Sequence, residues 1–260
     1  MIASRVTFYL ASQGIPGWQL NELKNLAGLF RSVIVLVNVA QCKRANIEHS
    51  LKLMSIKNCA GDMCQLIIEG LDAELACMVF SEYFSENHYL IATTHSQKRM
   101  SEEVLNNLPI KSLTVPLLWS FIETIATCKQ ELLAHAALEA CPARADQLLE
   151  ALLNREAISS TLIGEKVALP HVMHASVDEL SVIIQFTDYS IEWAEGKANP
   201  ELVVTLLVPA NKDRDTLQAC TRFTRWLLIP ENQQLLIDNR DEFILKAMVS
   251  HVMACYSPAV

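Results

Sequence analysis

The sequence predicts an α/β (α+β) protein made of two units. The first observation is that short runs of β-branched and apolar residues alternate with segments that carry a helical apolar stripe. The second is a polar segment without long periodicity at residues 89–102, which we expect to be a linker. The 260 residues then divide into a unit at 1–88 and a unit at 103–260.

In the first unit, residues 5–10 alternate between apolar and polar side chains, which predicts a half-buried strand. The segment 46–56 predicts a short helix whose buried face carries Ile47, Leu51 and Met54. The remaining elements expected here are helices at 14–30 and 72–87 and strands at 32–39, 41–46 and 62–70. The resulting order is βαββαβα.

The second unit predicts another mixture of helices and strands. The segment 117–141 predicts a helix that Pro142 ends. Residues 166–170 predict a strand that ends at Pro170, and the continuous apolar run at 202–208 is typical of a central strand. The remaining elements expected here are helices at 142–159, 214–228 and 241–255 and a strand at 181–186.

The composition argues against several classes of function. A net charge of −8 is unlike that of a general nucleic-acid binder, which needs a basic surface. No apolar run reaches the roughly 18 residues that span a bilayer, so we expect no direct membrane insertion. The 8 cysteines form no C-x-x-C pair, which favours reduced thiols, a cytoplasmic protein and no metal site.

The clearest chemical signal is the stretch LLNREAISSTLIGEKVALPH, which ends at His171. It matches the ordered pattern R-E-x-x-x-S-T-x-I-G-x-x-[VI]-A-[IL]-P-H, and the matching residues are Arg155, Glu156, Ser160, Thr161, Gly164, Ala168, Pro170 and His171. With this pattern, and with TLLVPA at 205–210, residues 103–258 resemble the fructose/mannitol-type enzyme IIA domain of the bacterial phosphoenolpyruvate-dependent sugar phosphotransferase system.

The resemblance implies an α/β sandwich that carries a phosphoryl group on His171. A neutral imidazole nitrogen is a nucleophile near pH 7, because the unperturbed pKa of the group is about 6.5. The implied donor is phospho-HPr, and the implied acceptor is the cysteine of a IIB domain on another chain. The resemblance implies no cofactor.

Arg155 is the implied phosphoryl-stabilising residue, since a guanidinium is always charged and presents a planar fork of donors. We expect it to lie within reach of His171 if the strand that ends at Pro170 folds back along the preceding helix. A surface charge near a helix C-terminus is the competing interpretation of Arg155.

One position departs from the family pattern. The family often carries a second histidine after the V-P-A block, and Thr216 occupies that place here. A hydroxyl can hydrogen-bond a phosphoryl oxygen but carries no positive charge. Thr216 and His174 are therefore the candidate accessory residues. An ordinary exposed histidine is the competing interpretation of His174.

The first unit resembles HPr, the small phosphocarrier of the same system, which implies a βαβ sandwich. The element order matches most of that fold, and the best-matching stretch is SLKLMSIKNCAGDMCQLIIEG at 50–70. The active-site motif G-[LI]-H-x-R-P-A does not match, because GIPGWQL places Pro16 at the histidine and Trp18 at the arginine. Proline has no nucleophile, so the resemblance implies a degenerate HPr-like unit kept for packing or docking.

Two functions remain open on the sequence. In the first, the chain is a phosphotransferase component that feeds sugar transport through His171. In the second, it is a regulatory protein that acts through phosphorylation-dependent partner binding and not through transport. Thr216 and the degenerate motif at Pro16 favour the second function. A third interpretation, a purely structural relic, would require the complete pattern around His171 to be accidental.

Overall fold

The structure is a computed structural model that describes residues 3–11, 14–96, 99–123, 126–187 and 191–256. The chain forms two compact units. Unit 1 comprises Met1–Ser112 and Ala247–Val260, and unit 2 comprises Leu113–Lys246. The C-terminal residues therefore belong with the N-terminal unit, whereas the sequence placed all of 103–260 in the second unit. Periodicity predicts a helix at 241–255, but it carries no information about the unit that buries the helix.

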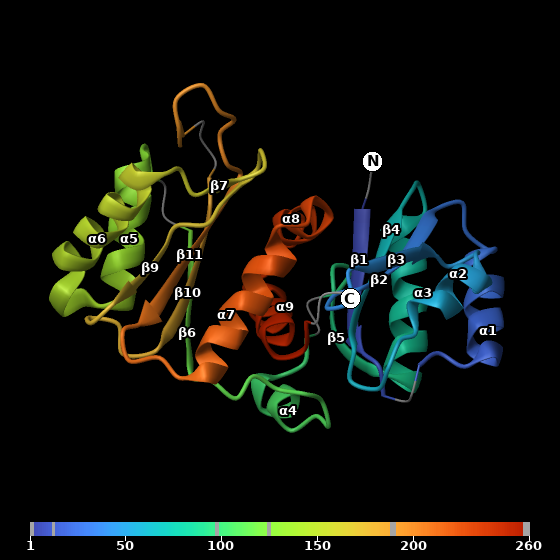
Figure 1. The fold of residues 1–260 in the computed structure, drawn as a ribbon. Coiled ribbons are helices and arrows are strands. Elements are labelled where there is room, and N and C mark those ends of the chain that lie inside the picture. The colour runs from blue at the N-terminus through green and yellow to red at the C-terminus, as the bar shows by residue number, and fades with distance from the viewer. Residues whose placement is uncertain (1–2, 12–13, 97–98, 124–125, 188–190, 257–260) are drawn as a thin grey trace. The chain divides into compact units, whose positions relative to one another are not determined.

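Among its described residues, unit 1 contains a five-stranded sheet in which all neighbouring strands are antiparallel (Figure 1). Its strand order is β3-β2-β4-β1-β5. The strands are β1 (Ala3–Tyr9), β2 (Val33–Asn38), β3 (Lys43–Asn46), β4 (Met63–Glu69) and β5 (Tyr89–Thr93). The helices are α1 (Gly17–Ala27), α2 (Ser50–Ile56), α3 (Ala73–Asn87) and α4 (Glu102–Asn106).

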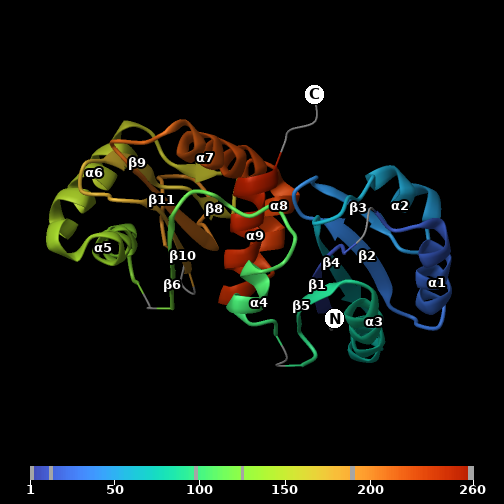
Figure 2. The ribbon, with the colours of Figure 1, turned by 90° about the horizontal axis from the view of Figure 1, so that it is seen from below.

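The predicted order βαββαβα is confirmed as far as the end of α3. The structure then adds β5 within the range 89–102, for which the sequence predicted a linker. This short segment becomes a strand because it pairs with β1, which is more than seventy residues earlier in the sequence. Helices α1 to α3 cover one face of this sheet (Figure 2). The core of unit 1 contains Val6, Phe8 and Leu10, the apolar side that the alternation at 5–10 predicted. Thr7 and Tyr9 are buried as well, so the prediction of a half-buried strand is wrong, because β1 is covered on both faces.

The predicted buried face of α2 is wrong. Ile47 is buried, but Leu51 and Met54 are 84% and 61% exposed, and Leu53 and Ile56 are buried in their place. The segment carries two overlapping apolar stripes, so the spacing within the helix does not decide between them. The position of the sheet decides which stripe is covered.

The second face of the unit 1 sheet contacts the end of α9 (Glu242–Cys255), whose residues from Ala247 onward belong to unit 1. His251 is 2% exposed. Its Nε2 accepts a hydrogen bond from the backbone N–H of Met63 at 3.2 Å, and its ring meets the Tyr9 ring edge-on at a centroid distance of 5.3 Å. A nitrogen that accepts a hydrogen bond is unprotonated, so the folded protein holds this imidazole neutral.

Burial of His251 predicts that the protein loses stability in mild acid. Burial lowers the pKa of His251 from 6.5 to about 4. The unfolded chain therefore binds one more proton than the folded chain between these two values, and stability that is present above pH 6.5 is lost as the pH falls toward 4. The loss from this residue is on the order of 3 kcal/mol.

The test of this prediction compares the wild type with a His251→Gln variant in urea unfolding across that pH range. The glutamine amide oxygen can still accept from the Met63 N–H. The variant should show a smaller fall in the free energy of unfolding on acidification, and an equal fall in both proteins would contradict the assignment.

Among its described residues, unit 2 contains a six-stranded sheet of order β6-β10-β11-β8-β7, with β9 also paired to β11. The strands are β6 (Leu117–Ile122), β7 (Leu162–Ile163), β8 (Val167–Ala168), β9 (His171–His174), β10 (Leu180–Phe186) and β11 (Leu202–Pro209). Strand β11 is antiparallel to β10 and parallel to β8 and β9. It is thus central, as its continuous apolar run predicted, and it is buried along most of its length.

The helices of unit 2 lie on both faces of this sheet (Figure 1). They are α5 (Lys129–Ala140), the 3-10 turn η1 (Pro142–Arg144), α6 (Ala145–Ile158), α7 (Arg214–Leu227), α8 (Pro230–Ile237) and the start of α9. Helices α5 and α6 cover one face, where Leu148 and Leu152 of α6 join the core. Helix α7 lies on the opposite face. The pocket described below lies on the α7 side of the sheet.

The predicted helix at 117–141 is wrong in its first part, where the structure has strand β6. Residues 124–125 of that range lie outside the described residues, and α5 confirms the helix at 129–140 but not at 126–128. The continuous run LLWSFI suits a strand and a helix equally well, and its parallel pairing with β10 decides for the strand. None of the helices in the described part of the chain has both the length and the apolar composition needed to cross a bilayer.

Candidate functional site

The sheet displays His171 at a break between two short strands. Strands β8 and β9 both pair with β11, and the chain between them passes through Leu169 and Pro170. Pro170 has no backbone N–H, but its carbonyl accepts a hydrogen bond from the N–H of Leu206 at 2.9 Å. The proline therefore interrupts the strand while remaining attached to β11, and His171 is the residue at which the strand resumes.

Two contacts define the state of the His171 ring. Its Nδ1 lies 2.9 Å from the carbonyl oxygen of Leu169. A carbonyl can only accept, so Nδ1 carries the proton of the neutral ring and Nε2 carries the lone pair. Nε2 in turn lies 3.5 Å from Nη2 of Arg155, which can only donate. Both neighbours thus favour the same tautomer, in which Nε2 is the nucleophilic atom.

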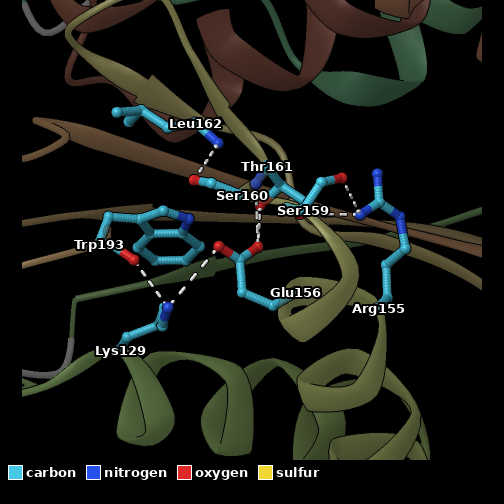
Figure 3. A network of polar contacts seen from close by, with 8 residues as sticks. All are labelled: Lys129, Arg155, Glu156, Ser159, Ser160, Thr161, Leu162 and Trp193. Atoms are coloured by element: carbon cyan, nitrogen blue, oxygen red, sulfur yellow. Dashed lines mark hydrogen bonds and ion pairs between the residues drawn. The ribbon is translucent and has the colours of Figure 1, made fainter. Parts of the chain in front are cut away.

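The expected contact between Arg155 and His171 is present. Arg155 occupies the last turn of α6, where its Nη1 donates to the carbonyl oxygen and to Oγ of Ser159 at 3.0 and 3.3 Å (Figure 3). Its Nη2 faces the His171 ring. The guanidinium therefore bonds Ser159 at the C-terminal end of α6, as the competing interpretation held. It also places a positive charge beside Nε2 of His171. Its role in phosphoryl transfer stays a prediction.

A pocket of about 590 Å³ opens beside this pair, on the α7 side of the sheet. Arg225 of α7 adds a second cation to the lining, and none of the described residues in the lining carries a carboxylate. The other lining residues are Val172, Met173, Leu206, Val208, Leu217, Cys220, Thr221 and Thr224. Apolar walls with two guanidinium groups suit an anionic group that is transferred away from bulk water.

Cys220 is the other strong nucleophile type in this pocket. Burial raises the pKa of the Cys220 thiol to about 11. At neutral pH it is a protonated thiol and a poor nucleophile. Of these two side chains, the imidazole of His171 is the better nucleophile at neutral pH.

A buried polar network supports the loop that follows α6 (Figure 3). Glu156, 8% exposed, accepts hydrogen bonds through Oε2 from the N–H and the Oγ1 hydroxyl of Thr161 at 3.1 and 2.6 Å. Its Oε1 lies 3.7 Å from Nζ of Lys129, which also donates to the carbonyl of Trp193 at 2.7 Å. Arg155 and Glu156 thus have separate tasks: the first faces the pocket and the second anchors the loop.

Neither candidate accessory residue lines the pocket described above. Thr216 is buried in the first turn of α7, where its N–H donates to Oδ1 of Asp213 at 2.8 Å. His174 lies three positions along β9 from His171, and residues at this spacing point to opposite faces of a strand. Its Nδ1 accepts from the N–H of Ser176 at 3.1 Å. An accessory role for either residue stays a prediction.

The degenerate motif of unit 1 lies at the start of α1. Pro16 is the residue that precedes the helix, and Trp18 is 59% exposed in its first turn. Neither side chain has a nucleophile. Within the described residues there is also no group of three histidine, cysteine or acidic side chains that could hold a metal ion.

Sequence reasoning missed two contributions to the site. Arg225 lies in TRFTRWLL, whose two arginines look like the solvated face of a helix, yet Arg225 lines the His171 pocket. No sequence signal points to Lys129, which is 27 residues before Glu156. Glu156 and Thr161 could have been found, because both stand at fixed places in the pattern that ends at His171.

Comparison with known proteins connects this site to a family. Residues 119–251 match the family model of the phosphoenolpyruvate-dependent sugar phosphotransferase system, EIIA 2. The chain is also similar to the 2-O-alpha-mannosyl-D-glycerate-specific EIIABC component of the phosphotransferase system of Escherichia coli (strain K12), with 35% identity over 83 residues. That match spans 30% of this chain and 12% of the relative.

Two solved structures resemble parts of the chain. The nitrogen regulatory protein IIA-Ntr from Neisseria meningitidis has 22% identity and a TM-score of 0.43, covering 51% of this chain and 92% of its own. HPr from Thermoanaerobacter tengcongensis has 21% identity and a TM-score of 0.29, covering 32% of this chain and 92% of its own.

Proposed function

Because this chain belongs to the EIIA 2 family of the phosphoenolpyruvate-dependent sugar phosphotransferase system, we propose that unit 2 is a phosphoryl carrier whose acceptor atom is Nε2 of His171. The observation that carries the proposal is the state of this ring. Its Nδ1 proton is engaged by the Leu169 carbonyl, and its free Nε2 lone pair faces the Arg155 guanidinium at the edge of the pocket.

The proposed donor is phospho-HPr, which presents a phosphohistidine. In the transfer step, the Nε2 lone pair of His171 attacks phosphorus and the phosphorus–nitrogen bond of the donor breaks. The bonding electron pair returns to the donor nitrogen, and a new phosphorus–nitrogen bond forms on His171. The phosphorylated ring still holds its proton on Nδ1 and is positively charged, and the Leu169 carbonyl stabilises that charge.

The proposed acceptor is the cysteine of a IIB domain on another chain. Its thiolate attacks phosphorus, and the electron pair of the bond that breaks returns to Nε2. Since Nδ1 kept its proton, the leaving group is a neutral imidazole in its starting tautomer. The carrier is therefore ready for another cycle without a proton rearrangement, and the two half-steps replace one direct transfer.

Arg155 is proposed to balance the charge that builds up on the phosphoryl oxygens. Phosphoryl transfer needs alignment of the reacting atoms and electrostatic stabilisation more than covalent chemistry. The guanidinium is already held beside Nε2 by its bonds to Ser159, so little reorganisation is required when the donor docks.

The proposal is tested by incubating the protein with phosphoenolpyruvate, enzyme I and HPr. Peptide mass spectrometry should locate the phosphoryl group on His171, and phosphorus NMR should identify its attachment to Nε2. A product attached to Nδ1, or a label on another residue, would contradict the proposed carrier atom. Addition of a IIB domain should then discharge the phosphohistidine.

Unit 1 is predicted to accept no phosphoryl group. With Pro16 and Trp18 at the motif positions, the stretch GIPGWQL that corresponds to the HPr active site has no side chain that can attack phosphorus. The full-length protein is offered phospho-enzyme I without HPr, while authentic HPr in a parallel reaction serves as the positive control. We expect label on the HPr control only. A phosphorylated peptide from unit 1 would show that a different residue of this unit is a carrier.

A further inference from the structure

We infer that Glu156 and Thr161 are positioning residues, which act through the Leu169 carbonyl to hold the proton of the His171 ring on Nδ1. The inference rests on the proposed phosphoryl transfer at Nε2, because it explains how this nitrogen is kept available. It assigns a task to two residues that do not line the pocket and do not touch the reacting atom.

The connection is a continuous series of hydrogen bonds. The Glu156 carboxylate accepts from the N–H and from the hydroxyl of Thr161. The Thr161 carbonyl accepts from the N–H of Leu169 at 2.9 Å. The Leu169 carbonyl accepts from Nδ1 of His171 at 2.9 Å. Thr161 and Leu169 flank the β7–β8 pair, so this bond extends the antiparallel ladder up to the residue before Pro170.

Because the network is buried, the loss of any one of its hydrogen bonds leaves a polar group without a partner. Glu156, Thr161 and Leu169 are 8%, 6% and 3% exposed, so water is poorly placed to replace a lost partner. The Lys129 ammonium pairs with the second carboxylate oxygen and is itself held by the Trp193 carbonyl (Figure 3). The carboxylate is therefore fixed from both sides, and Thr161 is fixed through it.

The position of the Leu169 carbonyl decides the chemistry at Nε2. A neutral imidazole carries one ring proton, and moving it from Nδ1 to Nε2 removes the lone pair that would attack phosphorus. The Arg155 donor beside Nε2 opposes that move, but it lies at 3.5 Å, whereas the Leu169 contact is at 2.9 Å. The Leu169 contact, as the shorter of the two, has the larger influence on which ring nitrogen carries the proton. Glu156 and Thr161 hold the Leu169 carbonyl in place.

The test compares Thr161→Val with Thr161→Ser in the full-length protein. Valine keeps the shape but loses the hydroxyl that bonds Glu156, whereas serine keeps the hydroxyl. Thr187→Val is the matched control, because the Thr187 hydroxyl also donates within unit 2, to the carbonyl of Pro200, but it lies outside the pocket lining and the network.

Two readouts are taken from each variant. The first is ¹⁵N NMR of the His171 ring above about pH 8, where a free imidazole is neutral, with the His171 signals assigned by their loss in His171→Ala. The second is the rate of phosphorylation by phospho-HPr. In Thr161→Val we expect a measurable Nε2–H population and a rate lowered by about tenfold, as when a residue that orients a functional imidazole is removed. Thr161→Ser and Thr187→Val should match the wild type in both.

The outcomes separate this inference from the proposed function. The inference would be overturned if Thr161→Val had the same His171 tautomer and the same phosphorylation rate as Thr187→Val. It would also be overturned if Thr161→Val were phosphorylated more slowly but kept the wild-type tautomer. A wild-type ring that is already a mixture of tautomers would overturn it even if His171 accepts phosphate. A wild-type ring with its proton on Nδ1 that accepts no phosphate would instead refute the proposed function, and the positioning role would fall with it.

A second variant covers the case in which Thr161→Val does not fold. Glu156→Gln keeps a side-chain oxygen that can accept from Thr161 but removes the charge that pairs with Lys129. We expect the same direction of change in tautomer and rate, and a smaller change than in Thr161→Val. Unchanged values in a folded Glu156→Gln protein would count against the inference in the same way.

Discussion

Replacement of His171 by alanine is expected to abolish phosphoryl uptake from phosphoenolpyruvate through enzyme I and HPr. The imidazole supplies the Nε2 lone pair, and the other nucleophile type in the pocket, the Cys220 thiol, is protonated because burial raises its pKa to about 11. No partial activity should remain, since removal of the accepting atom leaves no bond for the phosphoryl group to form. The measurement is incorporation of label from phosphoenolpyruvate.

The matched control is His174→Ala, which changes a histidine of the same strand whose ring bonds Ser176 and lies outside the pocket lining. This variant should still take up label, at the wild-type rate if His174 is an ordinary exposed histidine and more slowly if it has the accessory role. His171 is exposed, so its replacement should leave the thermal unfolding temperature nearly unchanged. Retention of wild-type labelling in a folded His171→Ala protein would refute the proposed site.

Replacement of Arg155 by alanine is expected to slow phosphorylation by about a hundredfold. The loss of one donor aimed at developing charge typically costs about 3 kcal/mol, which corresponds to roughly two orders of magnitude in rate. Arg155→Lys should recover part of the rate, because an ammonium keeps the charge but lacks the two-pronged geometry that contacts Ser159 and His171 together. The rate is measured in single-turnover reactions with phospho-HPr.

Arg222→Ala is the control for this second experiment, since Arg222 lies on α7 but does not line the His171 pocket. It should retain close to the wild-type rate. The Arg155 variants also lose a bond at the end of α6, so their unfolding must be measured beside the rate. An Arg155→Ala protein that is folded and accepts phosphate as fast as Arg222→Ala would remove Arg155 from the proposed mechanism.

The candidate site could be predicted in part because its residues stand in one short stretch. The apolar run at 166–170 predicted a strand that ends just before His171, whereas the structure places His171 at the first residue of a further strand, β9, after a break at Leu169 and Pro170. The sequence did not reveal the contribution of α7, because Arg225 comes to the pocket from a helix that begins more than forty residues after His171. A contact of this kind depends on how two elements pack against each other. The spacing of residues within each element does not predict it.

Local periodicity by itself determined the order of elements in the first unit as far as the end of α3, the strand at 5–10 and the central place of the run at 202–208. These features follow from the side-chain alternation of strands and from the apolar content of a strand covered on both faces. They need no knowledge of distant residues, and the structure confirms each of them.

Tertiary structure alone decided the buried stripe of α2, the strand character of 117–122 and the unit to which the end of α9 belongs. It also decided the tautomer of His171, which depends on the Leu169 carbonyl on one side and Arg155 on the other. The physical reason is common to all four. An apolar run or a titratable ring has several local states of similar free energy, and the partner that selects one of them is supplied by the packing of the folded chain.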